Sequence, residues 1–370
     1  MDMASFDSTH NSQIILRCIK NHGKQPLRFM EFCGGHTVAI FRSGIRQLLP
    51  PNITLISGPG CPVCVTSSGD LDLAISLASN PNLIITSFGD LLRVPGNHGT
   101  LLEARAHGAD VRIVYSTLAA LEIARQNPHK KVVFIGVGFE TTAPTIAAAI
   151  KKAKEENFHN FLVLSLCKLT PPIMQTILSS GEINIDGIIA PGHVSSIIGS
   201  HAWQFIASDF RIPVVVSGFE DTDILYCIQK LIEQNNKQQA LLQSAYTRSV
   251  SVQGNKVAQE LLNEVFESTA AIWRGIGSVP SSGLKLKKEY AAYDAFAVLD
   301  LQSDSKSSET PGCICGDIVR GAKTPNECRL FQKGTCTPQQ ACGPCMVSSE
   351  GTCAAYYHYY SPTIREKRNG

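Results

Sequence analysis

The chain has 370 residues, of which 44% are hydrophobic and 17% charged, and its net charge is +2 at pH 7, so we expect two or three globular domains with sizeable cores. The nearly neutral charge gives no reason to expect a nucleic acid or an anionic membrane surface as a partner. No stretch has the roughly 18 apolar residues that a membrane helix needs, and the N-terminus lacks a signal-peptide pattern, so the sequence favours a cytoplasmic protein with reduced thiols.

Short apolar runs of strand length recur through the first part of the chain. They are rich in Val and Ile, and most end near a Gly, Ser or Pro. In chain order they are Leu27–Phe32, Ile53–Ser57, Leu83–Thr86, Val111–Tyr115, Lys131–Val137, Phe161–Leu166, Gly187–Ala190 and Pro213–Ser217. Helix-compatible segments lie between them, such as Leu71–Ala78, Ala119–Arg125 and Thr145–Glu156. Apolar strands that alternate with helices are typical of parallel sheets covered on both faces.

We therefore predict an α/β fold with two similar doubly wound parallel-sheet domains, residues 1–125 and 126–220. Beyond these domains the pattern changes to two amphipathic helical segments, Asp223–Gln234 and Lys256–Phe266, followed by a cysteine-rich tail. The tail has few long apolar runs, which indicates that it needs a metal to fold. Residues 221–370 are thus predicted to form a helical, cysteine-rich C-terminal Fe–S domain.

The first candidate site follows the first predicted strand. Leu27–Phe32 runs directly into Cys33-Gly34-Gly35-His36-Thr37. Ligands of doubly wound sheets bind beyond the carboxyl ends of the strands, and the N-terminus of the next helix can lower the pKa of a thiol there. Cys33 is therefore a candidate reactive thiol, with His36 able to share its site. The alternative is a buried structural cysteine beside a glycine turn.

A dithiol follows the second predicted strand, Ile53–Ser57. Its sequence is Gly58-Pro59-Gly60-Cys61-Pro62-Val63-Cys64, and it should lie in the same cleft as Cys33. Two cysteines at this spacing can close a disulfide or share a metal. Together with Cys33 they could form a three-sulfur metal site. Half of a zinc site is the alternative for the dithiol.

The second block carries polar groups at the corresponding strand ends, in Gly138–Thr142, Pro191–His193 and Ser217–Glu220. These segments would line the matching edge of the second sheet. A glycine pair in Gly136–Gly138 resembles the start of a dinucleotide-binding motif, but Thr141 stands where the third glycine should be. His193 is equally compatible with a site group and with a structural histidine.

Seven of the thirteen cysteines lie in the tail: Cys313, Cys315, Cys328, Cys336, Cys342, Cys345 and Cys353. Seven sulfurs do not divide into two tetrahedral zinc sites, whereas four satisfy one [4Fe–4S] cluster and leave others for a redox pair. Structural zinc remains the alternative. A Cys-Gly-Pro-Cys run, Cys342–Cys345, looks like a thioredoxin dithiol, but no strand precedes it.

Taken together, these motifs resemble the HypD family of [NiFe]-hydrogenase maturation factors, from about Leu27 onward. The matching segments are Met30–Thr37, Gly58–Val65, Gly138–Pro144, Pro191–His193, Trp273–Gly277, Cys345–Cys353 and Ala354–Tyr357. The resemblance implies a scaffold on which the Fe(CN)2CO unit of the hydrogenase active site is built. It also implies work in complex with a HypC-type chaperone and cyanide from a HypE-type donor, with HypF acting upstream.

The resemblance also suggests roles for individual cysteines. Cys33 is the implied iron-site or partner-facing thiol, and Cys61 and Cys64 are the dithiol of the same iron site. The tail is similar to ferredoxin–thioredoxin reductase, which has a cluster beside a redox-active pair. This likeness assigns Cys315 and Cys345 to the pair and gives four residues to the [4Fe–4S] cluster. Those four are Cys313, Cys328, Cys336 and Cys353.

The chain departs from the family pattern at two positions. Val38 stands where the family usually has a second histidine, so any role of that imidazole is absent here. Cys342 is an extra cysteine that could substitute in the redox pair or be idle. The sequence leaves a stand-alone Fe–S thiol–disulfide oxidoreductase as the main alternative function, and a structural zinc protein as a further one.

Overall fold

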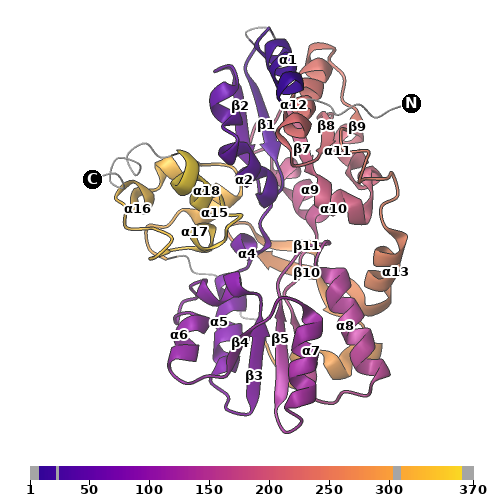
Figure 1. Cartoon of the computed structure of the whole chain (residues 1–370), viewed down its shortest axis with the longest axis vertical. Coiled ribbons are helices and arrows are strands. Elements are labelled where there is room, and N and C mark those ends of the chain that lie inside the picture. Colours follow the sequence, from indigo (N-terminus) through magenta and orange to yellow (C-terminus); the bar gives the residue numbers. More distant parts are fainter. Residues whose placement is uncertain (1–7, 22–24, 303–309, 361–370) are drawn as a thin grey trace.

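The computed structural model describes residues 8–21, 25–302 and 310–360. Two parallel sheets form separate lobes, with a long hairpin between them and the cysteine-rich tail beside their junction (Figure 1). This confirms the predicted α/β class with two doubly wound parallel sheets and a cysteine-rich C-terminal region. None of the helices in the described ranges is long and apolar enough to cross a membrane.

The first sheet has the strand order β2-β1-β7-β8-β9, with every neighbouring pair parallel. Its strands are β1 (Leu27–Glu31), β2 (Ile53–Ser57), β7 (Gly187–Pro191), β8 (Val214–Ser217) and β9 (Leu242–Ser244). One face packs against α1 (Ser8–Lys20), α2 (Gly34–Arg42), α3 (Ile45–Leu48) and α12 (Asp221–Asn236). The opposite face packs against α9 (Thr170–Ser180), α10 (Gly192–Ile198), η2 (Ser200–Trp203), α11 (Gln204–Ser208) and the tail. Successive strand residues alternate between these two cores, as the pleat requires.

The second sheet has the order β4-β3-β5-β6 and is also parallel. Its strands are β3 (Leu83–Ser87), β4 (Val111–Ile113), β5 (Lys131–Gly136) and β6 (Phe161–Ser165). One face is covered by α7 (Thr117–Gln126), α8 (Ala143–Glu155) and α13 (Lys256–Val265). The other is covered by α5 (Ser68–Ala78), η1 (Gly89–Arg93), α6 (Leu101–Ala106) and α14 (Ala295–Val298).

The sheets do not follow the contiguous blocks expected from the sequence. The first sheet combines β1 and β2 with three strands from beyond residue 186, and the second combines β3 and β4 with β5 and β6. The chain therefore passes from the first lobe to the second after β2 and returns after β6. The apolar runs locate the strands, but strand pairing depends on long-range packing that the local pattern does not encode.

A two-stranded antiparallel hairpin was missed in the sequence. It consists of β10 (Phe266–Trp273) and β11 (Gly277–Leu286), followed by η3 (Lys288–Tyr293). Only part of each strand is buried, so no continuous apolar run marks it. Trp273 is fully buried, stacks on Phe139 and donates its indole N–H to the Ser282 hydroxyl at 2.8 Å. Buried Trp273 thus fixes the turn between β10 and β11 at the junction of the lobes.

The tail consists of short helices joined by turns: α15 (Cys315–Val319), η4 (Pro325–Glu327), α16 (Arg329–Gln332), α17 (Pro344–Val347), α18 (Thr352–Ala355) and η5 (Tyr356–Tyr360). It packs against α2 and against α4 (Pro62–Val65), which carries the second half of the dithiol motif (Figure 1). The cysteine-rich tail therefore lies next to the cysteines at the front of the chain.

Candidate functional site

Cys33 lies at the carboxyl end of β1 and forms the N-cap of α2. The residue is partly exposed, but the pKa of its thiol is raised to about 12. Desolvation of the thiol is the main cause, and the charge of Glu350 is the next. Nearby backbone N–H groups of Gly35 and His36 oppose this effect without outweighing it. The expectation that the helix N-terminus lowers this pKa was wrong, because desolvation dominates here.

Glu31, the last residue of β1, is fully buried beneath Cys33. Its carboxylate accepts the Cys33 backbone N–H at 3.2 Å and the Thr37 hydroxyl at 2.5 Å. Burial raises its pKa to about 7, against the lowering effect of hydrogen bonds from Ser57 and Thr37. Sequence reasoning assigned Glu31 no role, although a carboxylate that ends an apolar strand was a usable signal.

Cys61 and Cys64 follow β2 and form a disulfide, with Pro62 opening α4 between them. The Cys64 backbone N–H also donates to the Cys61 sulfur at 3.2 Å. The loop before Cys61 presses directly on Cys33, because the Gly34 N–H donates to the Gly60 carbonyl at 3.0 Å. Neighbouring parallel strands end at the same sheet edge, which explains why the two motifs lie together. A three-sulfur iron site would require reduction of this disulfide, since thiolates are the ligands.

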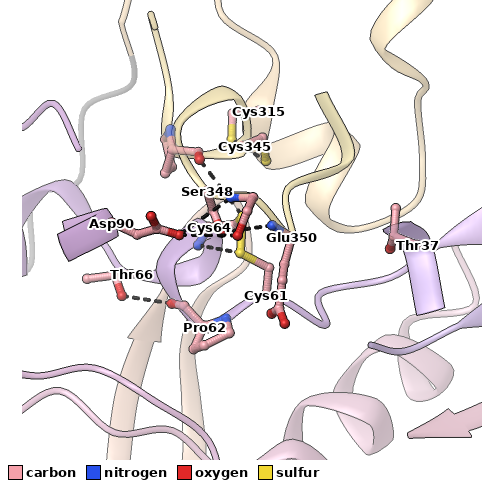
Figure 2. The surroundings of a disulfide bond; sticks show 12 residues. Thr37, Cys61, Pro62, Cys64, Thr66, Asp90, Cys315, Cys345, Ser348 and Glu350 are labelled. Carbon is pink, nitrogen blue, oxygen red and sulfur yellow. Dashed lines mark hydrogen bonds between the residues drawn. A yellow bond between two sulfur atoms is a disulfide. The ribbon is translucent and has the colours of Figure 1, made fainter. Parts of the chain in front are cut away.

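The tail covers the dithiol from the other side. Figure 2 shows Cys315 and Cys345 next to Cys61 and Cys64, with Glu350 alongside. The Cys64 sulfur lies 3.9 Å from the carbonyl oxygen of the residue before Cys345. A cavity of about 10 Å³ separates the groups and is lined by Cys61, Cys64, Cys345 and Glu350 among others. This volume is at the lower limit for one water molecule, so little space separates the tail from the dithiol segment.

Cys315 and Cys345, the pair implied by the family resemblance, lie together. Their sulfurs are 2.9 Å apart, and each residue is only 2% exposed. A hydrogen bond with Cys313 lowers the pKa of the Cys315 thiol, but contact with Cys345 and burial raise it well above the usual value. Arg274 also lowers it through its charge. Cys353 also lies against Cys345. The sulfurs therefore form a continuous chain in the order Cys313, Cys315, Cys345 and Cys353.

The other tail cysteines are arranged around this chain. Cys336 accepts the backbone N–H of Cys342 at 3.4 Å and is close enough to Cys313 and Cys353 for their charges to interact. Cys328 is buried at the N-cap of α16. Within the described ranges, no three His, Cys, Asp or Glu side chains are already grouped at metal-ligating positions. The donor set nevertheless suits an iron–sulfur cluster, because it is rich in buried thiols and set among apolar residues.

His36 packs against the loop after β8. It stacks on one face of Phe219, and His193 also stacks on that ring. His36 Nε2 donates to the Gly218 carbonyl at 2.9 Å, and burial lowers the pKa of the ring to about 4. Phe219 in turn reaches Gly35 beside Cys33. His36 and His193 therefore form, with Phe219, an aromatic wall next to the Cys33 loop.

The corresponding edge of the second sheet carries a second buried carboxyl group. Glu140 accepts the backbone N–H of Thr170 at 2.7 Å and its hydroxyl at 3.1 Å. Burial raises the pKa of Glu140 to about 7, although these hydrogen bonds lower it. Glu140 precedes α8 and Thr170 begins α9, so this contact links the segments that follow β5 and β6.

Replacing Glu140 with Gln is expected to change how stability depends on pH. The folded-state pKa is about 7 and the ordinary value 4.5, so the native state binds more protons between these values. The protonated carboxyl stabilises the fold fully below pH 4.5, and this contribution is lost as the pH rises through 7. As the pH rises from 4.5 to 7, the free energy of unfolding of Glu140→Gln should therefore increase relative to that of the parent by about 1.4 kcal/mol per pH unit.

Urea unfolding at several pH values between 5 and 7 would measure this difference. Glu155→Gln, at an exposed position of α8, is the matched control. Its free energy of unfolding should differ from that of the parent by the same amount at every pH. A difference between Glu140→Gln and the parent that stays constant over this range would show that Glu140 titrates normally in the folded protein.

Comparisons with known proteins identify the family of the chain. A profile described as "HypD: Hydrogenase formation hypA family" matches residues 10–360. Hydrogenase maturation factor HypD2 of Bradyrhizobium diazoefficiens is 48% identical over 345 residues, which cover 91% of this chain and 90% of the relative. Hydrogenase maturation factor HypD of Escherichia coli is 45% identical over 337 residues, covering 91% and 90%.

A third relative, hydrogenase expression/formation protein HupD of Azotobacter chroococcum, is 44% identical over 339 residues, covering 90% of this chain and 89% of its own length. The profile match, residues 10–360, includes every cysteine-bearing segment of the site. The chain belongs to the HypD family of hydrogenase maturation factors.

Proposed function

We propose that this chain, with a HypC-type chaperone, is the scaffold on which the Fe(CN)2CO unit of a [NiFe] hydrogenase is assembled. The observation that carries the proposal is that Cys33 and a disulfide lie at one sheet edge, with a pair of tail cysteines beside the disulfide. Cys33 and the Cys61–Cys64 disulfide come from the ends of adjacent strands. Cys345 of the tail lines a small cavity together with Cys61 and Cys64, and its sulfur lies 2.9 Å from that of Cys315. A redox-active pair beside potential iron ligands is the arrangement that a cofactor-building scaffold needs.

The iron is the cargo, and Cys33, Cys61 and Cys64 are its proposed ligands. Thiolates are soft ligands that suit iron(II), and cyanide and CO are strong-field ligands that hold it low-spin. Cys33 would become a thiolate when the incoming metal displaces its proton to water, and the other two ligands become available when their disulfide is reduced. Cyanide would come from a HypE-type donor, with HypF acting upstream. We place this assembly in the cytoplasm, where thiols stay reduced.

Each cyanide that arrives as a thiocyanate on a cysteine needs two electrons for its release. Cleavage of the sulfur–carbon bond, R–S–CN + 2e⁻ → R–S⁻ + CN⁻, balances only with a reductant. A [4Fe–4S] cluster at Cys313, Cys328, Cys336 and Cys353 would, when bound, supply electrons one at a time. Cys315 and Cys345 would collect two electrons as a dithiol, which suits a two-electron step.

The dithiol can reduce the Cys61–Cys64 disulfide by two exchange steps. The Cys345 thiolate attacks the Cys64 sulfur and releases Cys61, whose sulfur already accepts the Cys64 N–H. Cys315, 2.9 Å from Cys345, then attacks the Cys345 sulfur and releases Cys64. The products are a Cys61/Cys64 dithiol and a Cys315–Cys345 disulfide, so atoms and electrons balance without an outside reagent.

Infrared spectroscopy of the protein, purified anaerobically with its small chaperone, tests the proposal. We expect cyanide and CO stretching bands in the parent and their loss in Cys33→Ala. Cys18→Ala, at an exposed position of α1, is the control and should retain the bands. A parent complex that is brown and intact but has no such bands would contradict the scaffold function.

That outcome would favour the second candidate, a stand-alone Fe–S thiol–disulfide oxidoreductase. The close pairing of Cys315 with Cys345 beside an existing disulfide is the observation in its favour. Against it, the sulfurs of both pairs are buried, so a separate protein substrate would not reach Cys61, Cys64, Cys315 or Cys345. A stable complex with a small chaperone also distinguishes the two functions.

A further inference from the structure

A cavity of about 390 Å³ opens between the two lobes, at the carboxyl edge of the second sheet. Glu140 and Leu169, which follow β5 and β6, line it from the second lobe, and Ile198 and Ala202 line it from the first. Ligands of doubly wound sheets bind beyond the carboxyl ends of the strands, and small-molecule sites have volumes of about 300–1,000 Å³. The cavity therefore has the place and the size of a ligand site, and none of its described lining residues is a cysteine.

Helix α13 forms one wall of the cavity and is fixed to both lobes. It packs against α8 of the second lobe and α10 of the first (Figure 1). The side chain of Gln259 donates to the carbonyl groups of Ile197 and Gln253, at 2.7 Å in each case. Leu262, one turn further along the helix, is buried in the core of the second sheet. Because this wall is held on both sides, the cavity is already formed before a ligand arrives, as in most small-molecule sites.

Most of the side chains that line the cavity by burying little of their polar surface are apolar. They include Leu169, Ile198, Leu262 and Phe266. A ligand that covers these side chains removes their apolar surface and its own from water, which is favourable. The cavity therefore selects for a ligand with an apolar body.

The charges in the lining disfavour an ionic ligand. Among the described residues that line the cavity, none is a lysine, arginine or histidine, so an anion would find no cationic partner. The two acidic residues offer little to a cation. Glu140 is 1% exposed, and burial raises its pKa to about 7. Glu267 is already paired with Lys285 at 3.1 Å. A neutral molecule is the ligand that fits this lining.

We propose that this cavity binds a small neutral organic molecule with an apolar body and one polar group. Asn263 and Ser268, both exposed in the lining, offer hydrogen-bond donors and acceptors to that polar group. The site shares no residue with the iron and sulfur sites, so this inference does not depend on the proposed function. A molecule bound here would contact both lobes, and it would stabilise the folded chain because the unfolded chain has no such site.

Fluorescence titration of the full chain with Prodan, a neutral naphthalene ketone whose emission shifts to the blue in apolar surroundings, tests the proposal. The parent should bind this probe saturably. Ala202→Trp should weaken binding at least about tenfold, because a large ring at the wall fills space that the probe needs. Gln204→Trp is the matched control, at an exposed position two residues further that does not line the cavity, and it should bind as the parent does.

Two outcomes would overturn the site itself. One is a parent without saturable Prodan binding, and the other is unchanged binding in Ala202→Trp. If Ala202→Trp does not fold, Ser268→Trp fills the same cavity from an exposed position of β10. Unchanged binding in that variant would overturn the site equally.

Two further measurements test the kind of ligand. ANS, an anionic naphthalene dye, should bind the cavity at least about tenfold more weakly than Prodan, because no cationic side chain lines it. ANS binding that is as tight as that of Prodan and is lost in Ala202→Trp would show that the neutral class is wrong. Release of Prodan on addition of the small chaperone would show that the cavity receives a protein side chain, which would overturn the small-molecule assignment.

Discussion

Replacement of Cys345 with alanine is expected to abolish cyanide attachment to iron while leaving the absorption of the proposed iron–sulfur cluster in place. Cys345 faces the Cys61–Cys64 disulfide across the small cavity and lies 2.9 Å from Cys315. Without it, electrons have no sulfur path from the tail to the dithiol, and the disulfide stays oxidised. Infrared bands of cyanide on the protein-bound iron, measured after incubation with the cyanide donor, report the loss.

Two further variants make this prediction sharper. Cys315→Ala keeps the attacking thiol but removes the resolving one, so we expect a trapped Cys64–Cys345 mixed disulfide, detectable by peptide mapping. Cys342→Ala is the control from the same tail, because Cys342 lies beside Cys336 rather than in the pair, and it should retain cyanide attachment. A Cys345→Ala protein that still assembles the cyanide-bearing iron would show that the relay is wrong.

The strands could be predicted from the sequence because they are buried on both faces and therefore continuously apolar. Ile53–Ser57 coincides with β2, and the other parallel strands were located within a few residues, apart from β9. β9 is three residues long and partly exposed, so it lacks the apolar signal. The interleaving of the two lobes was not predictable, because each strand is compatible with several neighbours until the helices between them are packed.

The candidate site was partly predictable for a similar reason. The rule that ligands bind at the carboxyl ends of parallel strands indicated that Cys33, Cys61 and Cys64 lie together. The pairing of Cys315 with Cys345 could come only from the family resemblance, since residue spacing does not specify which tail sulfurs meet. Glu31 and Arg274 were missed because charged residues are usually exposed, and a sequence does not show which ones a fold buries.

Replacement of Gly60 with alanine is expected to destabilise the protein by about 3 kcal/mol and to separate the two thiol motifs. A Cβ atom at this position would lie 2.3 Å from the backbone nitrogen of Cys33 and 2.4 Å from its Cα. Because both atoms belong to backbone that connects β1 to α2, neither can move aside as a flexible side chain could. The close approach of the Cys33 and Cys61 loops therefore depends on the missing side chain.

Urea unfolding measures the loss of stability, and iron bound per chain after anaerobic reconstitution measures the loss of the site. Gly89→Ala is the matched control, because a Cβ there would meet only the Ile113 side chain at an ordinary 3.7 Å, and it should change stability by less than about 1 kcal/mol. A Gly60→Ala protein with parental stability would show that the two loops can separate freely. With parental iron content as well, it would show that iron binding does not need Cys33 held against the dithiol.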